Sequence, residues 1–273
     1  MWQQFLYHPI LNLLVFFYQI LFQNLGLAIL AMTVVLRAAL IPLTLPTLKA
    51  AQKQKDLAPE LEKLKKKHKD NKEKLAKAQM ELYRQHGVNP AAGCLPQILQ
   101  LIILIALYQA FIQVLSNDGQ AVLKLNEILY FDFLKLDPAR TINASFGPWT
   151  LSQPDRFFVL PILAGLSQLL LSKMMRPAVV KGSKEAKKTP DKSDDLMYTM
   201  QEQMLYMMPL MTIFIGWRLP SGLVLYWLAT TVFSLVQQYF VSGLGGLELW
   251  VRKINQNNYG RRQRTFGKVG LGG

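Results

Sequence analysis

The stretch LGLAILAMTVVLRAALIPLTLPTL, residues 25–48, decides the fold class. It is long enough to cross the hydrocarbon core of a bilayer, which takes about 20 helical residues. The first 36 residues of the chain contain no Lys, Arg, Asp or Glu, whereas residues 49–84 carry twelve Lys and Arg. Apolar residues and charges therefore occupy separate blocks, as in membrane spans that are joined by basic loops.

Four further apolar stretches follow in the 273-residue chain. They cover residues 94–115, 157–175, 204–219 and 222–243. The turn Leu219-Pro220-Ser221-Gly222 joins the last two into a tight hairpin. A single stretch of this kind is compatible with the core helix of a soluble protein, but five in one chain are not. We predict an all-α polytopic membrane protein with a five-transmembrane-helix core.

The composition excludes two other classes of protein. Residues of the types AVILMFWYC make up 51% of the chain, which excludes a disordered protein. The single cysteine, Cys94, excludes a disulfide scaffold. The formal net charge of +14 comes from 31 Lys and Arg against 17 Asp and Glu, and these charges are concentrated in loops.

The distribution of the basic residues predicts the orientation. Residues 49–88, 173–203 and 244–273 carry twelve, seven and six Lys and Arg, whereas residues 116–156 carry four. Because basic loops stay in the cytoplasm, the N-terminus is expected outside and the C-terminus in the cytoplasm. The chain is expected to cross its membrane several times.

Residues 5–22 are apolar but contain a polar stripe. His8, Asn12, Gln19 and Gln23 fall on one face of a helix. This pattern favours an amphipathic helix that lies on the outer leaflet. A sixth membrane span is the alternative.

The charged segment that follows residue 48 is periodic. Leu57, Leu61 and Leu64 recur at helical spacing, and a similar stripe runs from Leu75 to Leu82. Two antiparallel amphipathic helices are expected, forming a cytoplasmic helical hairpin. Its excess of positive charge would attract anionic lipid or ribosomal RNA, and charge alone does not choose between them.

These observations divide the chain into nine segments. The expected segments are an outer-face amphipathic helix (1–24), the spans 25–48, 94–115 and 157–175, the cytoplasmic helical hairpin (49–93), an extracytoplasmic loop (116–156), a cytoplasmic loop (176–203), a hairpin of the last two spans (204–243) and a basic cytoplasmic tail (244–273).

Arg37 is the one charged residue deep inside an expected span. It precedes Lys49 by twelve residues, or roughly 18 Å of helix, too far for its side chain to reach the interface. Such a charge costs about 2.5–3.5 kcal/mol on insertion scales. The expected spans contain no acidic residue, and Glu202 lies only at the edge of the fourth. A water-filled groove is therefore expected around Arg37, and the alternative is a set of bonds to exposed carbonyls near Pro42.

The other spans offer uncharged polar residues in helical register. We expect these residues to line the groove with Arg37: Thr33, Gln97, Gln100, Gln168, Ser172, Trp227, Thr231, Ser234 and Gln238. Any one of them alone is compatible with ordinary hydrogen bonding between helices. The sequence has no phosphate-binding loop, no metal-ligand spacing of its three histidines and no carboxylate pair in a span. We therefore expect neither an enzyme nor a bound cofactor or metal.

At this point the chain resembles the YidC-type membrane protein insertases, the bacterial members of the YidC/Oxa/Alb family. The resemblance runs from about residue 25 to residue 243, and the order and spacing of its motifs are specific. The motifs are Arg37 with Pro42-Leu43-Thr44, Val88-Asn89-Pro90-Ala91-Ala92-Gly93-Cys94-Leu95-Pro96, Ala106-Leu107-Tyr108, Leu160-Pro161-Ile162-Leu163-Ala164-Gly165, and Pro220-Ser221-Gly222-Leu223-Val224-Leu225-Tyr226-Trp227 with Gln237-Gln238.

The resemblance implies a positively lined groove that is closed to the outside and open to the cytoplasm and to lipid. Arg37 matches the groove arginine of the family, Thr33 matches its polar neighbour, and Tyr226 matches an aromatic residue associated with substrate contact. At Ser172 the family often has Gln, so that part of the groove wall is expected to differ.

The function that the resemblance implies is insertion and folding of membrane proteins without nucleotide hydrolysis. Short polar segments of nascent membrane proteins would pass through the groove, and their hydrophobic segments would be released into lipid. Nascent membrane proteins are the implied partners, the ribosome, the Sec translocon and anionic lipids are further candidates, and DNA is not expected. A small-solute channel or transporter is the alternative, since it would also need an intramembrane charge.

Overall fold

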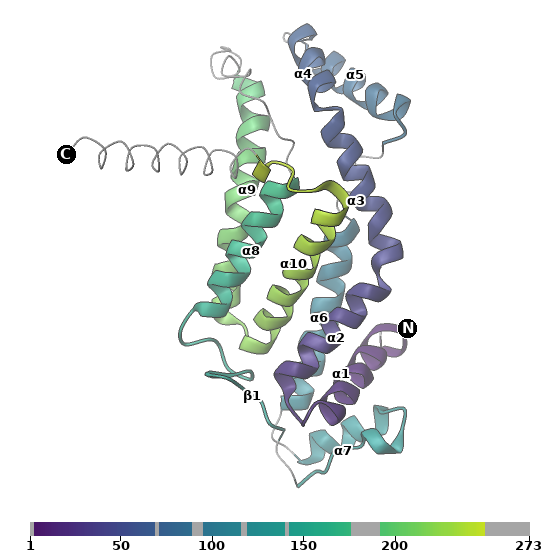
Figure 1. Cartoon of the computed structure of the whole chain (residues 1–273), viewed down its shortest axis with the longest axis vertical. Coiled ribbons are helices and arrows are strands. Elements are labelled where there is room, and N and C mark those ends of the chain that lie inside the picture. The colour runs from purple at the N-terminus through teal and green to yellow at the C-terminus, as the bar shows by residue number, and fades with distance from the viewer. Residues whose placement is uncertain are drawn as a thin grey trace, which may run out of the picture.

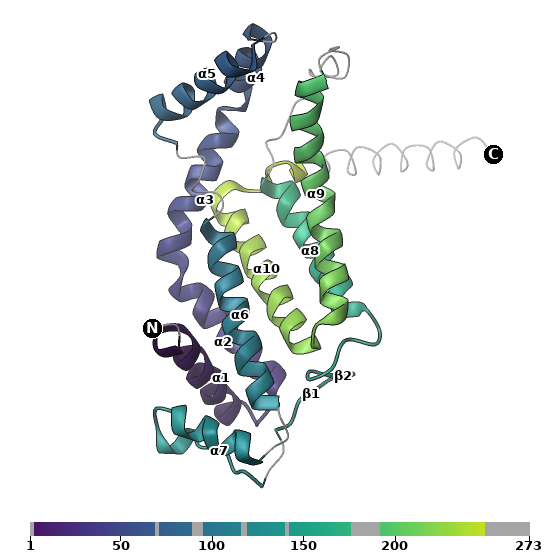
Figure 2. The ribbon, with the colours of Figure 1, turned by 180° about the vertical axis from the view of Figure 1, so that it is seen from behind.

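The computed structural model describes residues 3–68, 71–88, 95–115, 119–139, 142–175 and 192–248. Within these ranges the chain is mostly helical, with one two-stranded hairpin. Figures 1 and 2 show an elongated bundle of helices with a separate helical hairpin at one end and two short helices at the other.

The N-terminal segment folds back along the first expected span. A π-helix η1 (Gln3–Tyr7) continues into α1 (His8–Ile20), and a corner leads to α2 (Leu25–Ala39). Phe22 and Gln23 have φ angles of 57° and 53°, and the side chain of Asn24 accepts a hydrogen bond from the Leu27 backbone N–H at 3.1 Å. The expected polar stripe of α1 does not face water throughout, because Asn12 is only 6% exposed.

The first expected span is bent. After α2 the chain breaks at Leu40 and continues as α3 (Ile41–Asp56), with an angle of 64° between the two helices. Pro42 lies in the first turn of α3, where a missing N–H costs little, and Pro46 lies inside it. The straight helix expected over residues 25–48 is therefore two helices, and α3 extends eight residues past it.

The charged segment forms a pair of helices. They are α4 (Ala58–Lys67) and α5 (Lys72–Gln85), and Asn71 caps α5 by accepting a hydrogen bond from the Lys74 N–H at 2.9 Å. Leu57 and Leu82, both from the leucine stripes, are buried. In both ribbon views this pair lies at the end of the molecule opposite α1 and α7.

Four helices complete the bundle. They are α6 (Leu95–Leu115), α8 (Val159–Met175), α9 (Lys192–Arg218) and α10 (Ser221–Ser242). Helix α10 packs against α8 and α2, and α8 packs against α9. Helix α9 begins twelve residues before the expected start at residue 204, so the end of the expected loop 176–203 is helical, while residues 176–191 lie outside the described residues.

Two glycines allow close helix packing. A Cβ atom on Gly222 of α10 would overlap the ring of Phe111 of α6, and one on Gly165 of α8 would overlap Ile213 of α9. Among the described residues, α10 is long and apolar enough to cross a membrane. The bent pair of helices Leu25–Ala39 and Ile41–Ala50 is a second candidate span. Ile98–Val114 and Val159–Met175 are shorter apolar helices. The five-span core stays a prediction.

The segment expected as an extracytoplasmic loop contains ordered elements. They are α7 (Gly119–Ile128), the 3-10 helix η3 (Asp132–Leu134) and the strands β1 (Ser145–Phe146) and β2 (Trp149–Thr150). The Gln153 carbonyl accepts the Ser221 N–H at 2.8 Å, and the Leu151 carbonyl accepts the Gly222 N–H at 3.0 Å. This segment is therefore tied to the start of α10.

Candidate functional site

Arg37 lies in the last turn of α2, twelve residues or roughly 18 Å from the start of that helix. Its guanidinium donates a hydrogen bond to Oε1 of Gln100 on α6. The Gln100 Nε2 group in turn donates to the Tyr226 hydroxyl on α10, at 3.4 Å. Three helices that are distant in the sequence therefore meet at one chain of polar side chains.

The charge of Arg37 is not neutralised inside the bundle. Residues 25–48, 94–115, 157–175 and 204–243 contain no Asp or Glu. The ion pairs Lys77–Glu73 and Lys135–Asp132 lie on the helical hairpin and at η3. Gln100 holds the guanidinium as a neutral acceptor, so the full positive charge remains.

An apolar layer separates these polar groups from the end of the bundle where α7 lies (Figure 1). Its fully buried members come from the same three helices: Ile29, Met32, Leu107, Phe111 and Leu223. They lie on the side of α2, α6 and α10 that leads to α7 and the β1–β2 hairpin, whereas Arg37 and Gln100 lie toward α3 and the start of α6. The polar cluster is thus closed on that side by packed hydrophobic side chains.

Polar contacts continue toward the hairpin end. Gln237 of α10 donates from Nε2 to the hydroxyl of Thr44 on α3 at 3.0 Å. The Gln238 side chain is only 2% exposed, and its Oε1 accepts no hydrogen bond within the described part of the chain. The Nε group of Arg37 is likewise buried and has no acceptor there. Buried groups of this kind are costly unless water or a ligand satisfies them.

In three of the expected groove residues, the hydroxyl group donates to a carbonyl in the preceding turn of its own helix. Thr33 donates to the Ile29 carbonyl at 2.6 Å, Thr231 to the Trp227 carbonyl at 2.9 Å, and Ser234 to the Thr230 carbonyl at 3.0 Å. Bonds to the preceding turn are common for Ser and Thr inside helices. None of these three residues bonds directly to Arg37.

The remaining expected residues are placed less centrally. Gln168 and Ser172 on α8 and Trp227 on α10 are half-buried, and no hydrogen bond within the described ranges joins them to Arg37 or Gln100. The side chain of Gln97 lies outside the described ones. The structure therefore brings together Arg37, Gln100 and Tyr226 from the expected set.

The contacts of α10 are shifted by one position from the expected stripe. The expected residues were Trp227, Thr231, Ser234 and Gln238, but the residues that bond to α6 and α3 are Tyr226 and Gln237. One position turns a helix by about 100°, so the two stripes face different neighbours. Gln237 is eleven residues after Tyr226, and a stripe started from Tyr226 would have included it.

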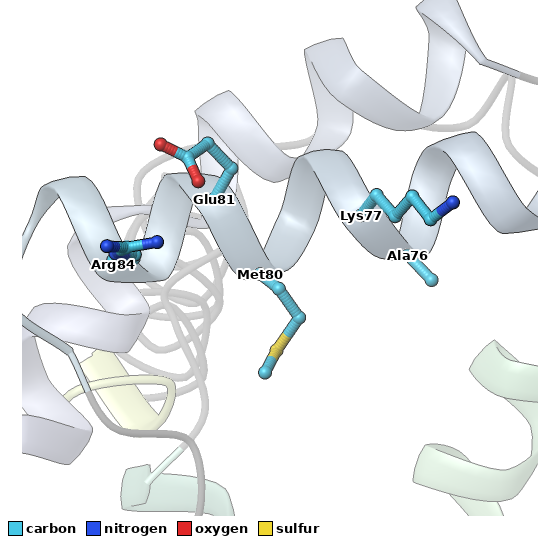
Figure 3. A pocket seen from close by; sticks show the side chains of 5 residues that line it. All are labelled: Ala76, Lys77, Met80, Glu81 and Arg84. Carbon is cyan, nitrogen blue, oxygen red and sulfur yellow. The ribbon is translucent and has the colours of Figure 1, made fainter.

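A second surface feature lies on the helical hairpin (Figure 3). A hollow of 520 Å³ runs along one face of α5 and is lined by Ala76, Lys77, Met80, Glu81 and Arg84. The Met80 side chain is 59% exposed and points into open space in Figure 3. A flexible apolar side chain flanked by charges of both signs suits contact with an apolar or amphipathic segment.

Comparison with known proteins gives consistent results. The family described as 60Kd inner membrane protein matches residues 16–244. The membrane protein insertase YidC of Fusobacterium nucleatum is 36% identical over 222 residues, which cover 81% of this chain and 88% of that protein. The YidC 2 insertase of Bacillus anthracis is 30% identical over 246 residues, which cover 89% of this chain and 81% of that protein.

Other relatives are longer than this chain. The YidC insertase of Haemophilus ducreyi is 32% identical over 240 residues, but these cover only 37% of its length. A crystal structure described as an active YidC insertase with the first transmembrane domain resolved matches 85% of this chain and 46% of that chain. Its TM-score is 0.54 at 23% sequence identity, which is a similarity of fold.

Proposed function

Because the chain belongs to the 60Kd inner membrane protein family, which includes the YidC-type insertases and is not an enzyme family, we propose that it inserts nascent membrane proteins into the bilayer. The chain is a membrane protein, and we place it in the bacterial plasma membrane with five spans. Its N-terminus lies outside and its C-terminus in the cytoplasm, according to the distribution of basic residues.

The barrier that an insertase must lower is the transfer of polar groups through hydrocarbon. An unsatisfied backbone group costs several kcal/mol there, and a carboxylate costs more. A groove that is open to the cytoplasm and closed by the outer apolar layer shortens the dry path. Arg37, Gln100, Gln237 and Gln238 line this groove and offer hydrogen bonds to the passing segment.

Arg37 attracts the polar outer end of the client. With Gln100 as a neutral partner, the guanidinium keeps its positive potential, and it holds a free Nε donor. An acidic or polar segment is therefore stabilised at this depth by a charge that is already in place. The step requires no covalent intermediate and no nucleotide hydrolysis.

The hydrophobic segment of the client leaves sideways into lipid. Helix α6 exposes Ile98, Leu101 and Ile105, and α10 exposes Val232 and Val236. Such surfaces let an apolar helix slide along the protein without leaving an apolar environment. The segment therefore reaches lipid while its polar end is held in the groove.

The helical hairpin receives the client before it enters the groove. The Met80 hollow offers an apolar contact at the cytoplasmic end. The basic surface of the hairpin would attract ribosomal RNA or anionic lipid, and the Sec translocon is a further candidate partner. The basic tail, of which residues 249–273 lie outside the described residues, would act in the same way.

The hydrogen-bonded chain from Arg37 through Gln100 to Tyr226 carries this proposal. Its test is photocrosslinking from benzoylphenylalanine at Tyr226 during translation of a small membrane protein. Tyr226 is buried in the bundle, and Phe214, which is exposed on α9, is the comparison position. We expect crosslinks of the nascent polar segment to position 226 in excess of those to position 214. Equal labelling, or solute flux through the purified protein in liposomes, would instead favour a channel or transporter.

A further inference from the structure

The outer face of the molecule carries aromatic side chains that the groove does not use. Phe131 and Phe133 are 59% and 61% exposed, and their rings stack with centroids 5.5 Å apart. The Phe133 ring also meets Phe16 of α1, edge to face, at 6.5 Å. These three residues, from two segments about 115 residues apart, form one surface, which we call the outer aromatic patch.

The patch is held on a rigid support. Asn12 of α1 accepts the Tyr130 N–H at 2.7 Å and donates to the Ile128 carbonyl at 3.2 Å. Asn126 bonds both the N–H and the carbonyl of Leu136, each at 2.8 Å. The Leu134 side chain, next to Phe133 in the chain, is buried in a cluster with Leu11 and Val15 of α1. The loop is therefore fixed at both ends, and its aromatic rings are held outward.

The contact of Asn12 with the loop also explains why this polar residue of α1 is buried. The central polar residue of the helix, Asn12, bonds to the loop, whereas Ile20 at the C-terminal end of the helix is exposed. Ile20 lies one turn from Phe16, on the same side of the helix. The exposed Ile20 therefore extends the apolar surface next to the patch, with the half-buried Gln19 beside it, and the corner after Ile20 leads to α2.

We propose that the outer aromatic patch inserts into the head-group region of the outer lipid leaflet. The patch lies one helical turn from the exposed Ile20 of α1, and the chain resides in a membrane. Aromatic side chains are enriched at the level of the head groups, where an apolar ring and nearby polar groups are both accommodated. The two charges beside the rings, Asp132 and Lys135, neutralise each other in an ion pair of 2.6 Å.

The same ion pair limits the depth of the patch. Asp132 lies between the two stacked rings in the sequence and its side chain is 93% exposed. A carboxylate is tolerated among head groups but not in the hydrocarbon core. The rings therefore rest at the interface, where they hold α1 and α7 against the leaflet. This role requires only that the chain is in the membrane, and it does not depend on client insertion.

The test is a spin-label measurement on the whole chain in liposomes. The single cysteine is removed as Cys94→Ser, and a nitroxide is attached at Phe131→Cys. Ala139→Cys, exposed in the same segment, serves as the aqueous control, and Leu166→Cys, exposed on α8, serves as the lipid control. The collision rates of each label with oxygen and with a water-soluble nickel chelate are compared.

We expect the label at 131 to favour oxygen over nickel, as at 166, and the label at 139 to favour nickel. A label at 131 that favours nickel as at 139 would overturn the proposal. A label that is immobilised and inaccessible to both reagents would also overturn it, because a protein would then cover the patch. Spectral broadening that disappears on dilution with unlabelled chain would identify that protein as a second copy.

Discussion

Replacement of Arg37 by alanine removes one positive charge from the groove without removing an opposite charge. The guanidinium is held by the neutral Gln100, so no buried carboxylate is left unpaired. Arg37→Ala is therefore expected to leave the bundle folded and to change the potential that a client meets. Arg37→Lys keeps a charge on a flexible stem that cannot reproduce the planar donor geometry.

The size of the effect follows from Coulomb's law. A carboxylate about 6 Å from the guanidinium gains roughly 3 kcal/mol at an effective dielectric constant of about 20, and less where water and salt screen it. A range of about 1–3 kcal/mol corresponds to roughly five- to 160-fold in insertion rate, if insertion limits that rate. Each added tail carboxylate should increase the dependence on Arg37.

The assay is insertion of one client into proteoliposomes, with zero, one or two carboxylates in its outer tail. For clients with acidic tails, the insertion rate of the wild type should match or exceed that of Arg37→Lys. The rate of Arg37→Ala should be far lower than both. Arg218→Ala is the matched control, because Arg218 lies at the C-terminal end of α9 over the ring of Trp217. Equal impairment of all three clients by Arg37→Ala would refute the electrostatic role and favour a structural one. No impairment would show that Arg37 is not needed.

Four further changes test other parts of the structure. Gln100→Glu should neutralise the charge of Arg37 and therefore lower the insertion of acidic clients as Arg37→Ala does. The same client series measures this effect, and unchanged insertion of acidic clients would contradict it. In a cysteine-free background, a cysteine at Asn143 should react with an impermeant thiol reagent from outside, and one at Ser183 only after the membrane is opened; the reverse pattern would invert the orientation. Replacing residues 57–82 with a Gly/Ser linker should leave the bundle assembled but lower insertion, whereas full activity would show the hairpin to be dispensable. Gly222→Leu should destabilise the protein by about 1–3 kcal/mol in thermal unfolding, because its side chain would overlap an aromatic ring of α6; an unchanged unfolding temperature would argue against that contact.

Much of the helical organisation follows from the order of apolar and charged blocks. Helices α6 and α8 begin and end within two residues of the expected bounds, because the apolar runs end at charges or turn residues. The bend at Leu40 was not predicted, although Pro42 and Pro46 lie just after it. Proline in the first turn of a helix is as compatible with a new helix as with an interrupted one.

The segment between α6 and α8 was harder to predict. Its order depends on pairwise contacts, such as Tyr18 accepting the Asn143 N–H at 3.0 Å, that no local pattern encodes. The same applies to α1, where helical spacing placed Asn12 on a water-facing stripe. Spacing gives the faces of a helix, but it does not say which face a distant loop will cover.

The candidate site shows the same division between local and distant information. Arg37 could be singled out because a lone charge in an apolar span demands a physical explanation, and Gln100 because it lies on the next span at the cytoplasmic side. The pairing of Arg37 with Gln100 could not be predicted, since the register between α2 and α6 is set by packing. That pairing matters for function: a carboxylate at the position of Gln100 would hold the guanidinium more tightly but would cancel its potential. A neutral amide holds the cation in place and leaves its charge available to a client, which is the property that an insertion groove needs.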